Sequence, residues 1–233
     1  MALAKKCIAA KVHNQLTILR RCQRYHDSEE LQKAEQQILA NRRHLSEAKD
    51  SEALMGYEGI IARIYFQVLG RTVPKSFAFS KRSKRPPLDP FNAMLSLGYT
   101  LLMYEIYTAL SNEGLHPYFG FLHTLKNHHP ALASDLMEEW RAVIVDSMVL
   151  SLVNQHRIKL EHFEKDENGE PGVFLTRHGR TIFLQAYEKK MRTRNQYVEG
   201  THSYRHSIAR QVYQYAQALM AQNADMYEPI YLR

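Results

Sequence analysis

Four ionisable residues sit in apolar surroundings in three separate parts of the chain. Glu58 lies in a mostly apolar segment, 54–66, and His123 lies among apolar neighbours in 114–124. Asp135 and Glu138 are three residues apart, so on a helix their side chains share a face. Burying such groups costs several kcal/mol unless they are paired or bind a cation. Carboxylates and an imidazole suit Mg²⁺ or Mn²⁺, with open positions for phosphate oxygens and water.

Ordinary structural roles would also explain these residues. Glu58 could pair with Arg63, which is near in sequence. A lone histidine is more often a hydrogen-bonded core residue than a ligand, and acid pairs three apart are common on solvated helix faces. Spacing alone leaves both interpretations open.

A second group of residues carries positive charge. Lys81, Arg82, Lys84 and Arg85 place four cations within five residues, directly before Pro86-Pro87. A loop stiffened by prolines can hold phosphates with little ordering cost. The alternative is a solvated basic loop with no ligand.

The whole composition also favours a polyanionic partner. Lys and Arg exceed Asp and Glu by 31 to 24, a formal charge of +7, which favours nucleic acid over an anionic membrane. The most apolar stretches, 59–69 and 142–153, are too short to span a bilayer, and the first residues lack a secretory signal. The two cysteines, Cys7 and Cys22, do not form a disulfide framework or a zinc motif. These features predict a protein of the reducing cytoplasm.

Apolar residues recur at helical spacing along most of the chain, which predicts a single all-α bundle over residues 1–233 with at most one short β hairpin. Asp50 and Ser51 are plausible caps of one helix that Gly70 ends, and Asp89-Pro90 begins another. Residues 166–172 form a turn-rich stretch, followed by a short strand over 173–176. The predicted helices are 3–25, 29–45, 51–69, 90–112, a short one near 121–125, 130–155, 180–194 and 203–223. The lysines and arginines of the first helix, Lys11 included, are assigned to its polar face.

Four motifs, in order along the chain, resemble one family: the first of the CRISPR-associated proteins, the integrase that inserts captured DNA as new spacers. The motifs are Gly56-Tyr-Glu-Gly with Ala62-Arg-Ile-Tyr-Phe66, the run from Arg85 to Leu102, Gly114-Leu-His-Pro-Tyr-Phe-Gly-Phe-Leu-His123, and Asp135-Leu-Met-Glu-Glu-Trp-Arg141. Weaker similarity continues to Arg233. Four ordered motifs are far more specific than any one of them.

The resemblance implies a metal-dependent DNA integrase and endonuclease. By motif, Glu58, His123 and Glu138 would bind the catalytic Mg²⁺ or Mn²⁺, and Asp135 would be a neighbouring catalytic acid. The loop of Lys81, Arg82, Lys84 and Arg85 would contact DNA, as would Arg63 and Arg141. The substrates would be captured DNA and the CRISPR repeat. A homodimer or larger assembly is expected, with the small second CRISPR-associated protein as a further partner.

Members of that family usually begin with a β-rich domain of roughly ninety residues, a size typical of an independent unit. This chain starts at the first helix of the catalytic domain. It is therefore expected to be a compact integrase, an excised piece or part of a fusion. Two further hypotheses remain: a non-catalytic DNA-binding module with structural acids, and an assembly subunit that docks other adaptation proteins.

Overall fold

The computed structural model describes residues 1–25, 28–123, 128–166, 171–197 and 200–232. The long helices are α1 (Ala2–Gln23), α2 (Glu29–Glu47), α3 (Ser51–Leu69), α4 (Pro90–Asn112), α5 (Ala131–Trp140), α6 (Ser147–Asn154), α7 (Arg177–Arg192) and α8 (Tyr204–Met220). A π-helical segment, η2 (Arg141–Asp146), joins α5 to α6, and single 3₁₀ turns occur at η1 (Lys75–Phe77), η3 (Leu160–His162) and η4 (Ala224–Met226). The strands are β1 (Phe163–Lys165), β2 (Val173–Leu175), β3 (Arg194–Gln196) and β4 (Thr201–Ser203).

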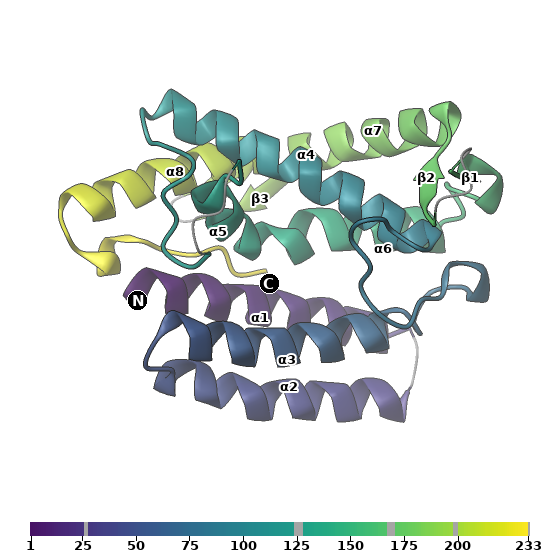
Figure 1. Cartoon of the computed structure of the whole chain (residues 1–233), viewed down its shortest axis with the longest axis horizontal. Helices are drawn as coiled ribbons and strands as arrows, with labels where there is room; N and C mark the ends of the chain where they lie inside the picture. Colours follow the sequence, from purple (N-terminus) through teal and green to yellow (C-terminus); the bar gives the residue numbers. More distant parts are fainter. Residues whose placement is uncertain (26–27, 124–127, 167–170, 198–199, 233) are drawn as a thin grey trace.

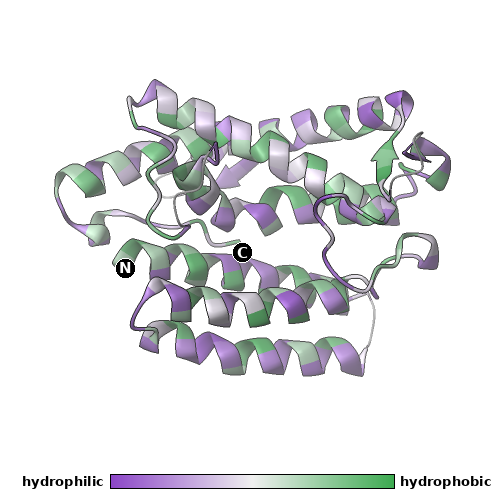
Figure 2. Cartoon of the chain, in the orientation of Figure 1, coloured by the Kyte–Doolittle hydropathy of each residue, from purple (hydrophilic) through white to green (hydrophobic). Residues whose placement is uncertain are grey.

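The helices form two groups on either side of a central segment (Figure 1). Helices α1, α2 and α3 contact one another in one layer, and α2 carries hydrophilic residues along much of its length (Figure 2). The segment α5–η2 contacts α1 on one side and α4 on the other, and α4 in turn contacts α8. Every residue of α5 is buried. Its acidic side chains therefore face other helices rather than bulk water.

Local sequence signals set several of the helix ends. The Asp50 carboxylate accepts a hydrogen bond from the amide of Ala53 at 2.8 Å, and Asp89 does the same for Asn92 at 2.8 Å, which confirms both predicted caps. Helix α3 ends before Gly70 as predicted, and a close approach of backbone requires glycine at this position. A Cβ atom at Gly70 would lie only 2.0 Å from the carbonyl oxygen of Phe79.

The predicted helix over 130–155 is present, but its middle is π-helical. The six residues of η2 follow Trp140 without a break in the helix. Across from η2, a Cβ atom at Gly98 would lie 2.5 Å from Cγ1 of Val145. Glycine at this position therefore lets α4 approach the π-helical segment closely. Such segments often occur where a helix carries functional side chains.

The helical-bundle prediction is confirmed, and three of its details are wrong. The described residues contain two antiparallel hairpins, β1–β2 and β3–β4, rather than at most one, because three-residue strands are too short to show an alternating pattern. Residues 121–123 are a loop and not the start of a short helix, since their amides bond to a carboxylate, as described below. Helix α7 begins at Arg177, before the predicted 180, because Thr176 caps it. Positions 124–125, and most of the predicted turn over 166–172, lie outside the described residues.

One hydrophobic core contains residues from Ala4 to Ile230. The segment after α8, residues 227–232, returns to α1 and is fixed there by Asn14. The Asn14 side chain bonds to the carbonyl of Ile230 at 2.9 Å and accepts from the amide of Leu232 at 2.7 Å. Both cysteines lie on α1 as predicted and are free thiols. In the described part of the chain, no helix combines the length and the apolar character needed to cross a membrane.

Candidate active site

The side chains of Glu58 and Glu138 converge on the ammonium group of Lys11. Glu58 comes from α3, Glu138 from α5 and Lys11 from α1, and all three are buried. The Nζ atom of Lys11 lies 2.5 Å from Oε1 of Glu58 and 2.5 Å from Oε2 of Glu138. Two carboxylates from different helices therefore share one cation in the interior of the protein.

A second cation, Arg141, contacts the other oxygen of Glu138. Its Nη2 atom lies 3.0 Å from Glu138 Oε1, and its guanidinium stacks on the ring of Tyr99 at 4.8 Å. Burial by itself would raise the pKa of Glu138, but Arg141, Lys11 and His123 outweigh burial and lower this pKa to about 2. Glu138 is therefore ionised at neutral pH, and His123 is close enough to influence it.

Asp135 organises the loop that carries His123. This carboxylate is fully buried and accepts hydrogen bonds from three successive backbone amides, those of Phe121 at 2.6 Å, Leu122 at 2.9 Å and His123 at 3.0 Å. Its Oδ1 also lies 2.5 Å from Nδ1 of the His123 ring. With Nδ1 turned to a carboxylate, Nε2 is the ring nitrogen that points away from Asp135. Carboxylates commonly orient metal-binding histidines in this way.

Gly120 lets the loop approach Asp135 this closely. A Cβ atom at position 120 would lie 2.5 Å from Oδ2 of Asp135 and 2.9 Å from the Cβ of Ala131. Both distances are shorter than side-chain contacts allow. The glycine in the motif before His123 is therefore a steric requirement of the contact with α5.

The ion-pair partner of Glu58 is not the residue that the sequence suggested. The proximity of Arg63 in sequence suggested that it could pair with Glu58, but the Arg63 side chain is exposed and the partner is Lys11. Lys11 was assigned to the polar face of its helix, and this was wrong. A signal was available, because Lys11 lies four residues after Cys7 and four before Gln15, and all three belong to the buried stripe of α1.

The basic loop reaches the same region through some of its members. Lys84 is exposed, yet partial desolvation of its ammonium lowers its pKa, and the nearby charges of Arg141 and Arg82 lower it further. Arg82 points inward, where it donates to Asn92 Oδ1 at 2.7 Å and Ser96 Oγ at 3.0 Å. Lys81 and Arg85 are exposed. Three members of the loop can therefore meet an external anion, whereas Arg82 anchors the loop to α4.

The donor set fits a divalent cation. Among the described residues, no three His, Cys, Asp or Glu side chains are grouped closely enough to form a ready metal site. Glu58 and Glu138 nevertheless place one oxygen each around a single point, and Asp135 holds the His123 ring nearby. The ammonium of Lys11 lies between the two carboxylate oxygens.

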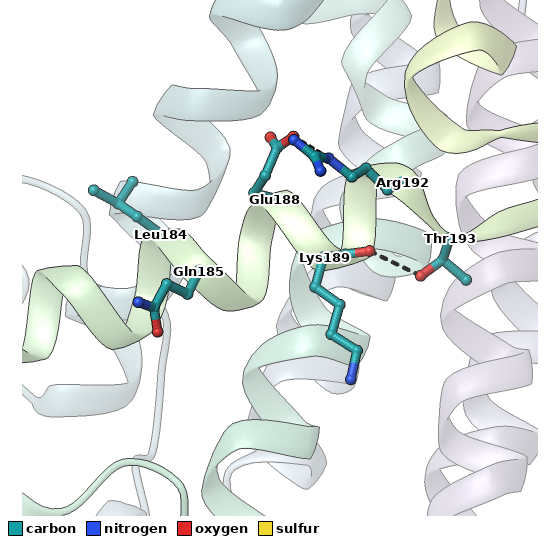
Figure 3. Close-up of a pocket in the computed structure, with 6 residues that line it drawn as sticks. All are labelled: Leu184, Gln185, Glu188, Lys189, Arg192 and Thr193. Carbon is teal, nitrogen blue, oxygen red and sulfur yellow. Dashed lines mark hydrogen bonds and ion pairs between the residues drawn. The ribbon is translucent and has the colours of Figure 1, made fainter.

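Two pockets elsewhere share no residue with this site. One, of about 700 Å³, lies along α7 and is lined by Leu184, Gln185, Glu188, Lys189, Arg192 and Thr193 (Figure 3). Two interactions join its lining residues: Glu188 pairs with Arg192 at 2.7 Å, and Thr193 donates to the carbonyl of Lys189 at 3.0 Å. The other, of about 670 Å³, lies between the end of α1 and α6. The chemistry-bearing side chains thus form a site separate from both pockets.

Residues 1–189 match the family model described as "CRISPR associated protein Cas1". A relative named CRISPR-associated endonuclease Cas1 3, from Thermus thermophilus, is 42% identical over 197 residues, which are 84% of this chain and 56% of the relative. The chain thus spans little more than half the length of that protein.

Solved structures agree with the sequence match. A chain of a complex named "Cas6-RT-Cas1--Cas2 complex" superposes with a TM-score of 0.88 at 28% identity, over 100% of this chain and 25% of that one. A casposase bound to integration product gives a TM-score of 0.84 at 27% identity, over 95% of this chain and 61% of that one. The family model, the relative and the two structures agree, and the chain belongs to the Cas1 family of CRISPR-associated proteins.

Proposed function

We propose that the chain is a metal-dependent DNA integrase and endonuclease that joins captured DNA to a CRISPR repeat. The observation that carries the proposal is the arrangement of Glu58 and Glu138 around one cationic position, with His123 oriented beside them by Asp135. The names of two proteins that the chain resembles, an endonuclease and a casposase bound to integration product, support the same chemistry.

Glu58, Glu138 and His123 would hold Mg²⁺ or Mn²⁺. Such an ion would neutralise charge on the phosphate and lower the pKa of the attacking or leaving oxygen. Asp135 keeps Nδ1 of His123 engaged, so that Nε2 is the ring nitrogen that would bind the ion. Arg141 and Lys84 add positive charge beside Glu138, where a phosphate would lie. Positioning and electrostatic stabilisation supply most of the rate enhancement in phosphoryl transfer.

The reaction exchanges one phosphodiester bond for another. A 3′-hydroxyl of the captured DNA attacks a phosphodiester at the edge of the repeat, and its oxygen forms the new bond to phosphorus. The bond to the flanking strand breaks, and that strand leaves with a free 3′-hydroxyl. No covalent enzyme intermediate is required. Two such attacks on opposite strands need two sites, so we propose a homodimer or larger assembly. Cas2 is a further proposed partner, since one structural neighbour comes from a Cas1–Cas2 complex.

The DNA would follow the exposed cations of the basic loop. Lys81, Lys84 and Arg85 are the members of the loop that are open to an external phosphate, and Arg63 is exposed on α3. These residues contact the backbone without reading sequence, because phosphate contacts fix position rather than specificity.

One observation favours a second candidate, a DNA-binding module without catalysis. The carboxylates of Glu58 and Glu138 are already neutralised by Lys11 and Arg141, as they would be in a purely structural cluster. Such a module would bind DNA in a salt-dependent way and would be indifferent to divalent ions.

The two candidates differ in a strand-transfer assay. The protein is incubated with Mn²⁺, a short duplex with 3′-hydroxyl ends and supercoiled plasmid, and joined products are followed on gels. We expect products with the unaltered protein and with His116→Ala, a control on the same loop whose side chain is exposed. His123→Ala and Glu138→Ala should abolish them. Joining that survives His123→Ala unchanged, or DNA binding without any joining, would reject the catalytic proposal.

A further inference from the structure

The ammonium of Lys11 occupies the position that a metal ion shared by Glu58 and Glu138 would need. It is 2.5 Å from an oxygen of each glutamate, so these two oxygens are at most 5.0 Å apart. A Mg²⁺ ion binds its oxygens at about 2.1 Å, so a pair that it shares is separated by about 4.2 Å or less. The carboxylates would move inward only slightly to bind such an ion, and the same point between them would be used.

The charges of the site do not allow a metal ion and the ammonium of Lys11 to lie between the two glutamates together. Glu58 and Glu138 carry two negative charges, and Lys11 and Arg141 balance them within the buried site. A divalent ion added beside an unmoved Lys11 would bring three cations against two carboxylates. Like charges at this separation repel strongly where water is scarce. Electrostatics and space therefore both require the ammonium to leave.

Arg141 is not the group that competes. It contacts Oε1 of Glu138, the oxygen that Lys11 does not use, and it rests on the ring of Tyr99. Within the described part of the chain, Lys11 is the cation that contacts both glutamates. Its flexible four-carbon stem lets the ammonium swing away without any movement of α1.

We propose that Lys11 is an internal counter-ion of the metal site. It holds Glu58 and Glu138 together in the metal-free protein, and a divalent ion must displace it from both carboxylates. This inference rests on the proposed metal-dependent function. Lys11 is a positioning residue in this scheme, because it keeps the site assembled and sets how tightly the metal binds. Competition makes the metal affinity of the unaltered protein lower than its ligands alone would give.

The test compares Mn²⁺ binding by the full chain and two variants, using calorimetric titration without DNA. Lys11→Met keeps an apolar stem and removes the charge, and Lys11→Gln is a second neutral variant in case the first does not fold. Lys5→Met is the matched control on the same helix, since Lys5 is half-exposed and its ammonium bonds only to the carbonyl of Ser46 at 2.6 Å. Circular dichroism establishes that each variant is folded.

We expect Lys11→Met or Lys11→Gln to bind Mn²⁺ at least about tenfold more tightly than the unaltered protein, whereas Lys5→Met should bind equally. In thermal unfolding, the Lys11 variants should melt at a lower temperature than the unaltered protein without Mn²⁺. Saturating Mn²⁺ should then raise the melting temperature of the Lys11 variants by more than that of the unaltered protein, because ligand stabilisation grows with affinity. Suppose that the unaltered protein binds Mn²⁺ and the Lys11 variants bind it no more tightly. That result overturns the counter-ion role of Lys11 but leaves the metal site in place. If none of the proteins binds Mn²⁺, the proposed metal site fails as well.

Discussion

Gly120 and Asp135 show how tightly single residues determine the geometry around His123. The loop amides of 121–123 all point at one carboxylate, and only a residue without a side chain fits between them and α5. The position of the imidazole therefore depends on the contact between this loop and α5.

Gly120→Ala should displace this loop. The added Cβ atom would lie 2.5 Å from Asp135 Oδ2, and overpacking of this kind costs about 1–3 kcal/mol of stability. We expect a lower urea midpoint and a loss of strand transfer. Gly56→Ala is the control, because a Cβ atom at this helical position meets no atom within 4 Å. It should keep activity and gain roughly 0.5–1 kcal/mol. Equal behaviour of the two variants would contradict the steric role of Gly120.

Asp135→Asn tests whether this acid positions His123 or binds the metal itself. In either orientation the amide nitrogen would face backbone N–H donors, those of Phe121 and Leu122 or that of His123, and only one oxygen would remain to accept. Loss of a group that orients a metal ligand typically lowers activity about 10–100-fold. We expect a drop of this size in the rate of strand transfer, with residual activity above that of His123→Ala. A variant as inactive as His123→Ala would instead place Asp135 among the metal ligands.

At the scale of elements, the π-helical segment η2 ends in a buried acid, Asp146. Tyr65 donates to Asp146 Oδ2 at 2.9 Å, and Tyr99 donates to Oδ1 at 2.5 Å. Burial raises the pKa of Asp146 from 3.8 to about 6, even though the two tyrosine hydrogen bonds lower it. The folded protein therefore binds more protons than the unfolded chain between these two pH values.

Because the folded-state pKa is the higher one, this group makes folding less favourable as pH rises from about 4 to about 6. The loss should be roughly 2–3 kcal/mol, at 1.36 kcal/mol per pH unit. We expect the unfolding free energy of the unaltered protein to fall over this range relative to that of Asp146→Asn, as measured by urea unfolding at several pH values. A difference between the two proteins that stays flat, or rises with pH, would contradict the assignment.

The basic loop makes a prediction about salt. Lys84 is exposed yet close to Arg141 beside the site, so it should contact a phosphate. Lys84→Ala should weaken DNA binding for all sequences alike and reduce the slope of log K against log salt concentration by about 0.9. Lys75→Ala is a control with a lysine of the preceding 3₁₀ turn, and it should leave the slope unchanged. Fluorescence anisotropy at several salt concentrations measures both. An unchanged slope for Lys84→Ala would place the DNA elsewhere.

For the whole molecule, the C-terminal segment couples α1 to α5. Asn14 on α1 donates to the carbonyl of Glu139, the residue after Glu138, at 2.9 Å, and it also holds Ile230 and Leu232. Glu139 in turn accepts from the amide of Ile230 at 2.9 Å. The two helices that carry Lys11 and Glu138 are thus tied together by residues 14, 139 and 227–232.

Asn14→Ala should release this connection. It removes three hydrogen bonds of a fully buried side chain and leaves their backbone partners unsatisfied, which costs about 2–4 kcal/mol. We expect that loss in urea unfolding, and faster proteolysis of the C-terminal segment in the folded protein. Asn41→Ala on α2 is the control, since that side chain is exposed and bonds only to Gln37 of its own helix. Its effect should be within about 0.5 kcal/mol. If Asn14→Ala changed the unfolding free energy as little as the control, residues 227–232 would not hold α1 and α5 together.

The helical elements could be predicted from the amino-acid pattern, because their signals are local. Apolar periodicity and the caps Asp50 and Asp89 each act within a few residues, and they hold in the structure. The motifs also identified Glu58, His123 and Glu138 as the chemically interesting residues, and the matched family model covers these positions. The second hairpin, β3–β4, and the start of α7 escaped prediction because three-residue strands and a single cap give weak local signals.

The contacts of the site residues could not be predicted, because they join helices that are far apart in the sequence. Lys11 is 47 residues from Glu58 in the chain, and Ile230 is 91 residues from Glu139, so no local pattern connects them. Whether a charged side chain meets water or another charge depends on how whole helices pack. A lysine on a helix face becomes a buried counter-ion only when two other helices bring carboxylates to it, and that outcome is a property of the assembled bundle.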